Sequence, residues 1–412
     1  ATGQRVRLSR PLDWLVVADH GVAMGAMMEL YKGNPALLKD ERLRRWHLMM
    51  NESPEKGVEA ALEVIAAGSQ GDVPPAMLNP RILRSVWDDY LEAADEFNEP
   101  GRFTTLFGYE WTSLFEGDNL HRVVVFRDDK SKVEQIVPYS FLESGPDPER
   151  LWDFLENYES RTGGNVLALA HNGNLSNGRM FALTTFEGSP MTRDYAERRA
   201  RWEPMYEVTQ IKGDGEAHPF LSPDDEFADY GTWDLGNLDL SELKTDDMLA
   251  GEYAREALKN GLRLEQQLGA NPFKFGLVGS TDAHNSLPAV AEENFWGKHS
   301  GKEPSPHRWE TPVLEFGENK IMGWEPVSAG LAAVWATENT REAIWDAMYR
   351  KEVYATTGSR IFVRFYGGWD FKPADAAGRQ PAEIGYAKGV PMGGDLSKAP
   401  SGKAPTFLVA AL

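Results

Sequence analysis

The run 275–284 constrains the fold of this chain more than any other stretch. An apolar segment, 275–279, leads into Asp282-Ala283-His284. A short apolar run bounded by turn signals is typical of a buried strand, and ligands in α/β proteins bind at the carboxyl ends of such strands. An aspartate and a histidine at that point suit Zn, Mn or Fe. A lone Asp-x-His is a weak signal, so a metal site is predicted only if the construction recurs.

The same construction recurs in three further strand-like segments. Each is an apolar run that carries a metal-capable side chain at or near its end. The side chains are Asp19-His20 after 14–18, Glu110 within 103–111, and His171 after 165–170. Parallel strands bring their carboxyl ends to one face of a barrel or sheet, so we expect these residues to converge.

His121 is a further candidate ligand. It opens the apolar run 122–126 and follows a Gly-Asp-Asn loop at 117–119, which favours a hairpin return from the strand that carries Glu110. The alternative for His121 is an imidazole at a surface strand edge. For Asp19-His20 the alternative is a capping aspartate with an incidental histidine.

Composition narrows the chemistry. The chain has no cysteine, so disulfides, thiolate zinc sites and a cysteine nucleophile are excluded, and any metal must be held by His, Asp or Glu. Its formal charge of −20 argues against nucleic-acid partners. No apolar run approaches the roughly 18 residues of a membrane span. Hydrophobic content of 42% is ordinary for a globular protein.

Four motifs, in this order, resemble the PHP (polymerase and histidinol phosphatase) metal-dependent hydrolases: Asp-His at 19–20, Gly-Tyr-Glu at 108–110, Ala-His-Asn-Gly at 170–173 and Thr-Asp-Ala-His at 281–284. Further stretches resemble a PHP-like bacterial family of unknown function, DUF3604. They are Gly-Tyr-Glu-Trp-Thr at 108–112, Ile-Lys-Gly-Asp-Gly-Glu at 211–216, Glu-Asn-Phe-Trp-Gly-Lys at 293–298 and Tyr-Ala-Thr-Thr-Gly-Ser-Arg at 354–360.

The resemblance implies an α/β fold, a distorted seven-stranded β/α barrel of the PHP or TIM-like kind, with two or three divalent ions (Mn, Zn or Fe) at its carboxyl face. The barrel would span residues 1–366, with a long acidic insertion at about 221–247. Residues 367–412 would form the start of a β-rich C-terminal extension. The implied ligands are His20, Glu110, His121, His171, Asp282 and His284, with Asp19 a ligand or a partner of one. His171 and His284 should each donate the far ring nitrogen to a carboxylate or carbonyl.

The PHP pattern opens with a His-x-His strand, and no histidine precedes His20. We therefore expect a first strand upstream of residue 1 that pairs with 14–18. The compartment stays open: periplasmic or secreted if a signal peptide lies upstream, cytoplasmic otherwise. The oligomeric state also stays open.

The chemistry expected of such a chain is hydrolysis of a small anionic ester by metal-activated hydroxide, because no cysteine or Gly-x-Ser-x-Gly nucleophile is present. A phosphate ester is the first expectation. A sulfatase or other ester hydrolase on the same metals, and a catalytically silent metal-stabilised binding protein, are the alternatives. Lys212, Lys298 and Arg360 are candidates for anion recognition. His218 is a candidate for proton transfer. Each of these could instead be an ordinary surface or loop residue.

Overall fold

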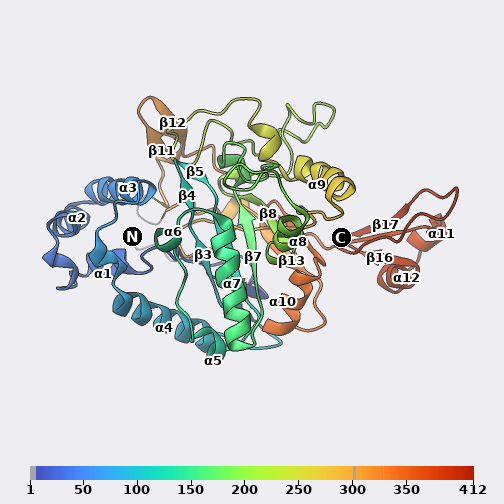
Figure 1. The fold of residues 1–412 in the computed structure, drawn as a ribbon, viewed down its shortest axis with the longest axis horizontal. Coiled ribbons are helices and arrows are strands. Elements are labelled where there is room, and N and C mark those ends of the chain that lie inside the picture. Colours follow the sequence, from blue (N-terminus) through green and yellow to red (C-terminus); the bar gives the residue numbers. More distant parts are fainter. Residues whose placement is uncertain (1–5, 300–302, 328) are drawn as a thin grey trace.

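A computed structural model describes residues 6–299, 303–327 and 329–412, and its centre is a mixed sheet (Figure 1). The hydrogen-bonded order of this sheet is β10-β8-β7-β6-β3, with β9 on β8. The strands are β3 (Gly108–Trp111), β6 (Arg122–Phe126), β7 (Val166–His171), β8 (Met205–Gln210), β9 (Gly213–Asp214) and β10 (Gly276–Gly279).

Strand direction decides which residues share an edge of this sheet. β7 pairs in parallel with β8, and β8 with β10. β6 runs antiparallel to both of its neighbours, β3 and β7. The end of β3, the start of β6 and the ends of β7, β8 and β10 therefore lie along one edge. The hairpin predicted between Glu110 and His121 is confirmed, with the small ladder β4 (Leu114–Phe115) and β5 (Asp118–Asn119) at its tip.

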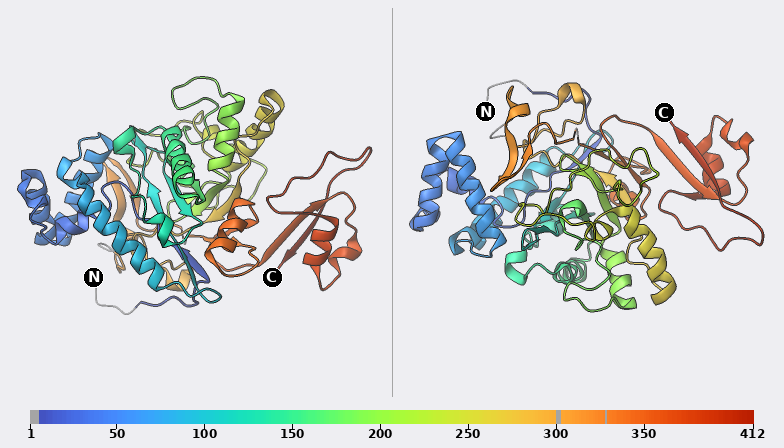
Figure 2. Two further views of the ribbon diagram at one scale, coloured as in Figure 1. Left: turned by 60° about the horizontal axis from the view of Figure 1, so that its bottom comes forward. Right: turned by 90° about the horizontal axis from the view of Figure 1, so that it is seen from above.

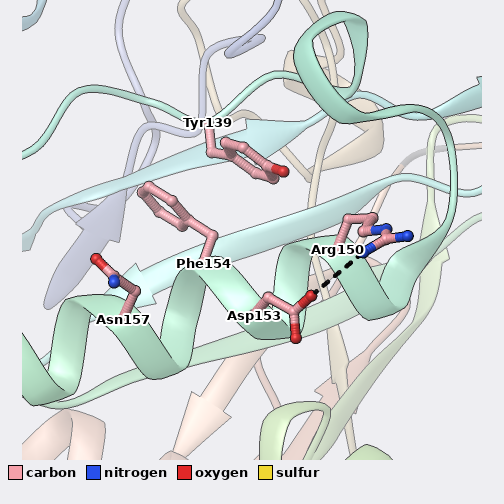
Figure 3. A pocket seen from close by; sticks show the side chains of 5 residues that line it. All are labelled: Tyr139, Arg150, Asp153, Phe154 and Asn157. Carbon is pink, nitrogen blue, oxygen red and sulfur yellow. Dashed lines mark ion pairs between the residues drawn. The ribbon is translucent and has the colours of Figure 1, made fainter.

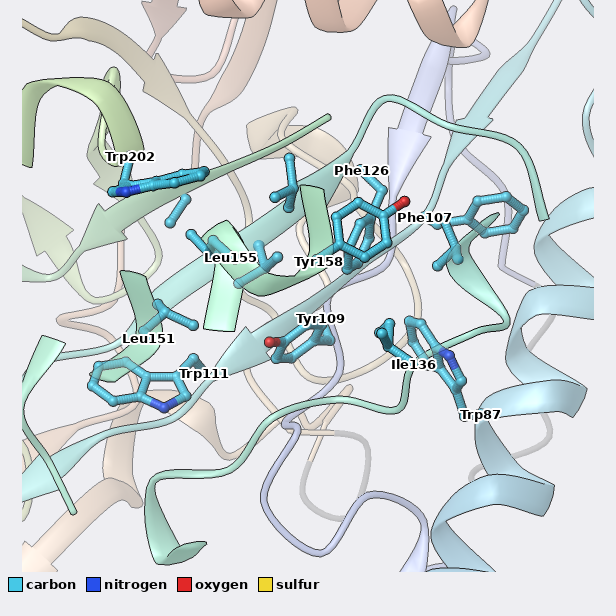
Figure 4. Close-up of a cluster of buried hydrophobic side chains, with 14 of the residues drawn as sticks. Trp87, Phe107, Tyr109, Trp111, Phe126, Ile136, Leu151, Leu155, Tyr158 and Trp202 are labelled. Atoms are coloured by element: carbon cyan, nitrogen blue, oxygen red, sulfur yellow. The ribbon is translucent and has the colours of Figure 1, made fainter. Parts of the chain in front are cut away.

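Helices cover one face of the sheet through an aromatic core (Figure 4). Alternate residues of a strand point to opposite faces, and Val124 and Phe126 of β6 face this core. Tyr109 of β3 contacts Trp87 edge-on, with ring centroids 6.2 Å apart. Tyr158 meets Phe126 at 5.0 Å in the same manner. The covering helices are α4 (Pro80–Glu96), α5 (Lys130–Val133), α6 (Phe141–Ser144) and α7 (Pro148–Thr162).

The opposite face has a second apolar core. Val125 of β6 and Leu167 and Leu169 of β7 pack there with Ile344 and Met348 of α10 (Arg341–Tyr349). Apolar side chains on both faces explain why 165–170 reads as a continuous apolar run. α8 (Arg193–Trp202) and α9 (Ala254–Leu268) flank the β7–β8–β10 side.

The N-terminal part forms a helical lobe beside the sheet (Figure 2). Its helices are α1 (Ala26–Tyr31), α2 (Glu41–Glu52) and α3 (Pro54–Ser69), which lead into α4. β1 (Trp14–Val16) pairs in parallel with β2 (Thr104–Leu106). Among the described residues β1 has no ladder on its other side. The upstream strand stays a prediction.

The C-terminal part begins with two antiparallel strand pairs, the second of which is connected through α10, and ends in a projecting sheet (Figure 1). The ladders are β11 (Pro312–Phe316) with β12 (Asn319–Met322), and β13 (Leu331–Val334) with β14 (Val353–Thr356). The projecting sheet has the order β16-β15-β17, from β15 (Val363–Gly368), β16 (Gly389–Pro391) and β17 (Thr406–Ala411), with α11 (Pro373–Ala376) and α12 (Pro381–Lys388) beside it. β15 crosses the boundary that the sequence suggested between 366 and 367.

The architecture is thus mixed α/β, as expected. Its ladders are assigned to separate sheets, so the closed seven-stranded barrel stays a prediction. Among the described residues, no helix is both long and apolar enough to cross a bilayer.

Candidate metal centre

The edge where β3, β6 and β7 meet holds a buried carboxylate between two buried imidazoles. Glu110 Oε1 lies 2.9 Å from His171 Nε2 and 3.3 Å from His121 Nδ1. The exposed fractions of the three residues are 5% for Glu110, 5% for His121 and 3% for His171. One ligand atom from each lies within 4.8 Å of the others, which suits a shared ion. The sequence had indicated this convergence.

The nitrogen and oxygen atoms of this group are better placed to bind a metal ion than to form hydrogen bonds with one another. His121 Nε2 and His171 Nδ1 are buried and have no hydrogen-bond partner among the described residues, and His171 Nε2 contacts only the Glu110 carboxylate. Buried polar atoms normally find a partner. A divalent ion would satisfy imidazole and carboxylate donors together, and the set suits Zn, Mn or Fe. The expected hydrogen bond from the far nitrogen of His171, Nδ1, is not formed with any of the described residues.

Electrostatics hold the group in its ligating form. Burial raises the pKa of Glu110, but the neighbouring His121 and His20 outweigh burial and hold that pKa well below its usual value. Burial lowers the pKa of His121 to about 4, although Glu110 opposes the shift. Glu110 is therefore a carboxylate and His121 a neutral imidazole near neutral pH, and these are the forms that bind metals.

His20 reaches the same carboxylate from the segment after β1. Its Nδ1 forms an ion pair with Glu110 Oε2, and a parallel bridge links the two residues. Gly21 allows this approach, because a Cβ there would lie 2.9 Å from the Tyr109 ring. Burial lowers the pKa of His20, but the Glu110 charge and hydrogen bond outweigh it and raise the pKa overall.

Asp19 acts through its backbone. Its carbonyl accepts a hydrogen bond from the Glu110 N–H at 2.8 Å, and its side chain is exposed. The carbonyl therefore holds the 19–21 segment against β3. A ligand role for the Asp19 carboxylate stays a prediction.

Thr112 is a partner of the centre that the sequence reasoning did not assign. Its hydroxyl donates to Glu110 Oε2 at 2.6 Å and lies 2.8 Å from His20 Nδ1. The signal was its place two residues after Glu110, in a motif quoted for the family resemblance but given no role.

Asp282 and His284 follow β10 in a strained turn. Both adopt left-handed backbone conformations, with φ of 47° and 54°. For residues other than glycine such conformations cost of order 1–3 kcal/mol each and cluster at functional sites. His284 Nδ1 lies 3.0 Å from the Asp282 carbonyl, which is the carbonyl partner expected for it. Partial desolvation of the ring and the nearby charges of Lys298 and Lys212 lower the pKa of His284 well below its usual value, although 32% of its side chain is exposed.

Two buried lysines meet at Asp282. Lys212, after β8, forms an ion pair with Asp282 Oδ2, and Lys298 Nζ donates to the Asp282 carbonyl at 2.7 Å. The surface alternative for both lysines is wrong, because they are 8% and 7% exposed. Burial lowers the pKa of Lys298 to about 7. Burial and the adjacent Lys298 lower the pKa of Lys212 well below its usual value.

Imidazole rings connect the two halves of the site. His171 contacts His121 with ring centroids 5.5 Å apart, and His121 lies 6.3 Å from His20. His20 lies 5.5 Å from His284, which lies 5.1 Å from His299. His299 is thus a second residue that the sequence reasoning passed over. His299 directly follows the stretch 293–298, which was quoted for the family resemblance, but it was given no role.

With this geometry in view, the chain was compared with known proteins. A family model described as "Protein of unknown function (DUF3604)" matches residues 1–412. The chain belongs to the DUF3604 family. Neither a curated protein nor a solved structure matches it significantly.

Two residues expected at the DUF3604 site make their observed contacts elsewhere. Arg360 donates to the carbonyls of Pro11 and Arg10, at 2.7 and 3.3 Å. His218 Nε2 lies 2.9 Å from Asp234 Oδ2, and its Nδ1 accepts from the Phe220 N–H. Their roles in anion recognition and proton transfer stay predictions.

A surface hollow of the DUF3604 chain lies apart from these groups (Figure 3). It has a volume of about 450 Å³, and its lining residues are Tyr139, Arg150, Asp153, Phe154 and Asn157. None of the candidate metal ligands lines it. A second hollow of about 470 Å³ lies beside Asn177 and Met248 and likewise contains no candidate ligand. Neither hollow is part of the candidate centre.

Proposed function

We propose that this DUF3604 chain is a divalent-metal-dependent hydrolase of the PHP type that cleaves a small anionic ester, with a phosphate ester as its first substrate class. The observation that carries the proposal is the convergence of Glu110, His121 and His171 in a buried group in which His121 Nε2 and His171 Nδ1 have no partner among the described residues. His20, Asp282 and His284 would complete the ligand set for two or three ions.

In this proposal each residue has a definite task. Glu110 would bridge the two sides of the site, since its Oε1 faces His121 and His171 while Oε2 faces His20. Bound divalent ions would supply an activated water and polarise the ester. Lys212 would hold the anionic group of the substrate next to Asp282. The PHP-like barrel is proposed as the frame that carries these strand ends.

The test combines elemental analysis with an ester panel. The full chain, purified without chelator with Mn²⁺ or Zn²⁺ supplied, should hold at least two divalent ions and hydrolyse one class among phosphate monoesters, phosphate diesters and sulfate esters. Exchanging His171 for Ala should lower both the metal content and the rate of hydrolysis, while exchanging the exposed His307 for Ala should change neither. Fewer than one ion per chain under these conditions would reject the proposal. Bound metal with no hydrolysis across the panel would instead favour the binding-protein alternative.

A further inference from the structure

Two lysines from separate loops share one carboxylate at the candidate centre. Lys212 follows β8, and Lys298 follows the short 3₁₀ turn Glu292–Asn294. Lys298 Nζ lies 3.7 Å from Asp282 Oδ2, the oxygen with which Lys212 forms its ion pair. The same Lys298 Nζ lies 3.1 Å from His284 Nδ1. Both ammonium groups therefore meet directly beside two candidate metal ligands.

The local charge balance favours an anionic ligand at this pair. A buried charge costs several kcal/mol unless it is matched by a partner. Asp282 is the carboxylate in contact with both lysines, and it is also a candidate metal ligand. Glu110 is already surrounded by three imidazoles, and the buried Glu207 is a further carboxylate whose charge acts on both lysines. Divalent ions would add further positive charge, so a singly charged ligand would neutralise the site less well than a doubly charged one.

The number of unused N–H donors on the two lysines also favours an anionic ligand. With both lysines protonated the pair carries six N–H donors, and a bound anion would favour that form against the burial that lowers both pKa values. The acceptors they contact among the described residues are Asp282 O and Asp282 Oδ2, while His284 Nδ1, 3.1 Å from Lys298 Nζ, is itself placed to donate to the Asp282 carbonyl. This leaves donors for the oxygens of a ligand. Lysine is suited to such a group because it is a compact charge with three rotatable donors.

We propose that Lys212 and Lys298 form a paired-lysine clamp that selects a doubly charged tetrahedral group, and hence phosphate monoesters over phosphate diesters and sulfate esters. The clamp rests on the proposed function for its place in catalysis. A phosphate monoester carries about −1.5 to −2 charge at pH 7. A phosphate diester or a sulfate ester carries one negative charge and would leave one lysine unmatched.

The test measures binding of inorganic phosphate, sulfate and acetate to the full chain by calorimetry, with and without Mn²⁺. Lys212→Met and Lys298→Met should each weaken phosphate binding roughly 10- to 100-fold, the loss expected for a charge-assisted hydrogen bond. Acetate binding should change much less. The matched control is Lys274→Met, which removes an exposed lysine paired with Asp395 at 2.7 Å and should leave phosphate binding unchanged.

Lys298 also holds the Asp282 carbonyl, so a purely structural role must be separated from anion binding. Lys298→Arg keeps the charge and a donor, and should retain most of the phosphate affinity that Lys298→Met loses. If Lys298→Met does not fold, Lys212→Met decides, because the Lys212 ammonium contacts the Asp282 side chain. Unchanged phosphate affinity in the folded lysine-to-methionine variants would overturn the clamp.

The outcomes separate the clamp from the proposed function. Lysine-dependent phosphate binding by a chain that neither holds metal nor hydrolyses any ester would uphold the clamp and reject the hydrolase. The opposite outcome is hydrolysis that prefers sulfate esters or phosphate diesters, together with a phosphate affinity that neither lysine substitution changes. It would reject the clamp and uphold the proposed hydrolase function.

Discussion

The Thr112 hydroxyl donates a 2.6 Å hydrogen bond to Oε2 of Glu110, the carboxylate on which three imidazoles converge. The same hydroxyl lies 2.8 Å from His20 Nδ1. Thr112 thus touches both a central and a peripheral candidate ligand. Partners of this kind fix the orientation of metal ligands.

Replacing Thr112 with Val tests this relationship, because the two side chains have the same shape and differ in the hydroxyl. We expect metal affinity to fall roughly 10- to 100-fold, the usual effect of removing such a partner. Competition with a chromophoric chelator measures the affinity directly. Thr112→Ser keeps the hydroxyl and should bind metal nearly as well as the unmodified chain. Equal affinity in the Val and Ser variants would show that the hydroxyl has no orienting role.

Removing His171 should have a larger effect than removing His284. His171 is buried at the end of β7 and faces Glu110, whereas the His284 side chain is 32% exposed in the turn after β10. We expect His171→Ala to lose at least one ion per chain and to lower turnover about a hundredfold or more, as for a misplaced reactant. His284→Ala should lose less metal. Elemental analysis and initial rates on the same preparations provide the comparison.

Much of the fold around the site could be predicted because its strands carry strong local signals. The apolar run 165–170 and the Asp147-Pro148 helix start correspond to β7 and α7. Asp147 accepts a hydrogen bond from the Glu149 N–H at the helix start, as a capping residue should. Glu110 and His121 could be placed together because a short loop between two strands implies a hairpin.

Other elements gave weaker signals. α2 begins at Glu41, after Asp40, whose carboxylate accepts hydrogen bonds from the Arg42 and Leu43 N–H groups, and its buried apolar positions, Leu43 and Trp46, are few and lie among charged residues. The contacts of Lys298 and His299 could not be foreseen, since both come from an irregular loop whose path depends on tertiary packing. Thr112 was missed for a related reason: a side-chain hydrogen bond leaves no periodic pattern in a sequence.

A buried ion cluster beneath the centre should contribute strongly to stability. Glu203 Oε1 accepts hydrogen bonds from Arg122 Nε and Trp152 Nε1, both at 3.0 Å, and Arg199 lies 3.5 Å from Oε2. Replacing Glu203 with Gln leaves the buried Arg122 without its counter-charge, so we expect a loss of about 3–5 kcal/mol in the free energy of unfolding.

Urea denaturation of the Glu203→Gln variant measures this loss. The control is Glu197→Gln, in the same region of the chain, which removes an exposed pair with Arg193 and should cost no more than about 1 kcal/mol. Equal stability in the two variants would mean that the buried cluster contributes no more than a surface pair.

The last prediction concerns the pH dependence of stability and uses Asp214 of β9. Asp214 is 9% exposed, and burial raises its pKa to about 7, although hydrogen bonds from the Ala217 and Glu216 N–H groups oppose the shift. In the unfolded chain an aspartate titrates near 3.9. A raised pKa in the folded state means that the folded chain holds this proton more tightly than the unfolded chain does. The stabilisation is fully present below about pH 4 and is lost as the pH rises through about 7.

Asp214→Asn can keep an oxygen acceptor for Ala217 and does not ionise. The free energy of unfolding of the unmodified chain, minus that of Asp214→Asn, should therefore fall by roughly 2–4 kcal/mol between about pH 4 and pH 8. Asp229→Asn, at an exposed position, should show a nearly constant difference over the same range. A difference for Asp214→Asn that is flat or rises with pH would show that this carboxyl is ionised in the folded chain throughout.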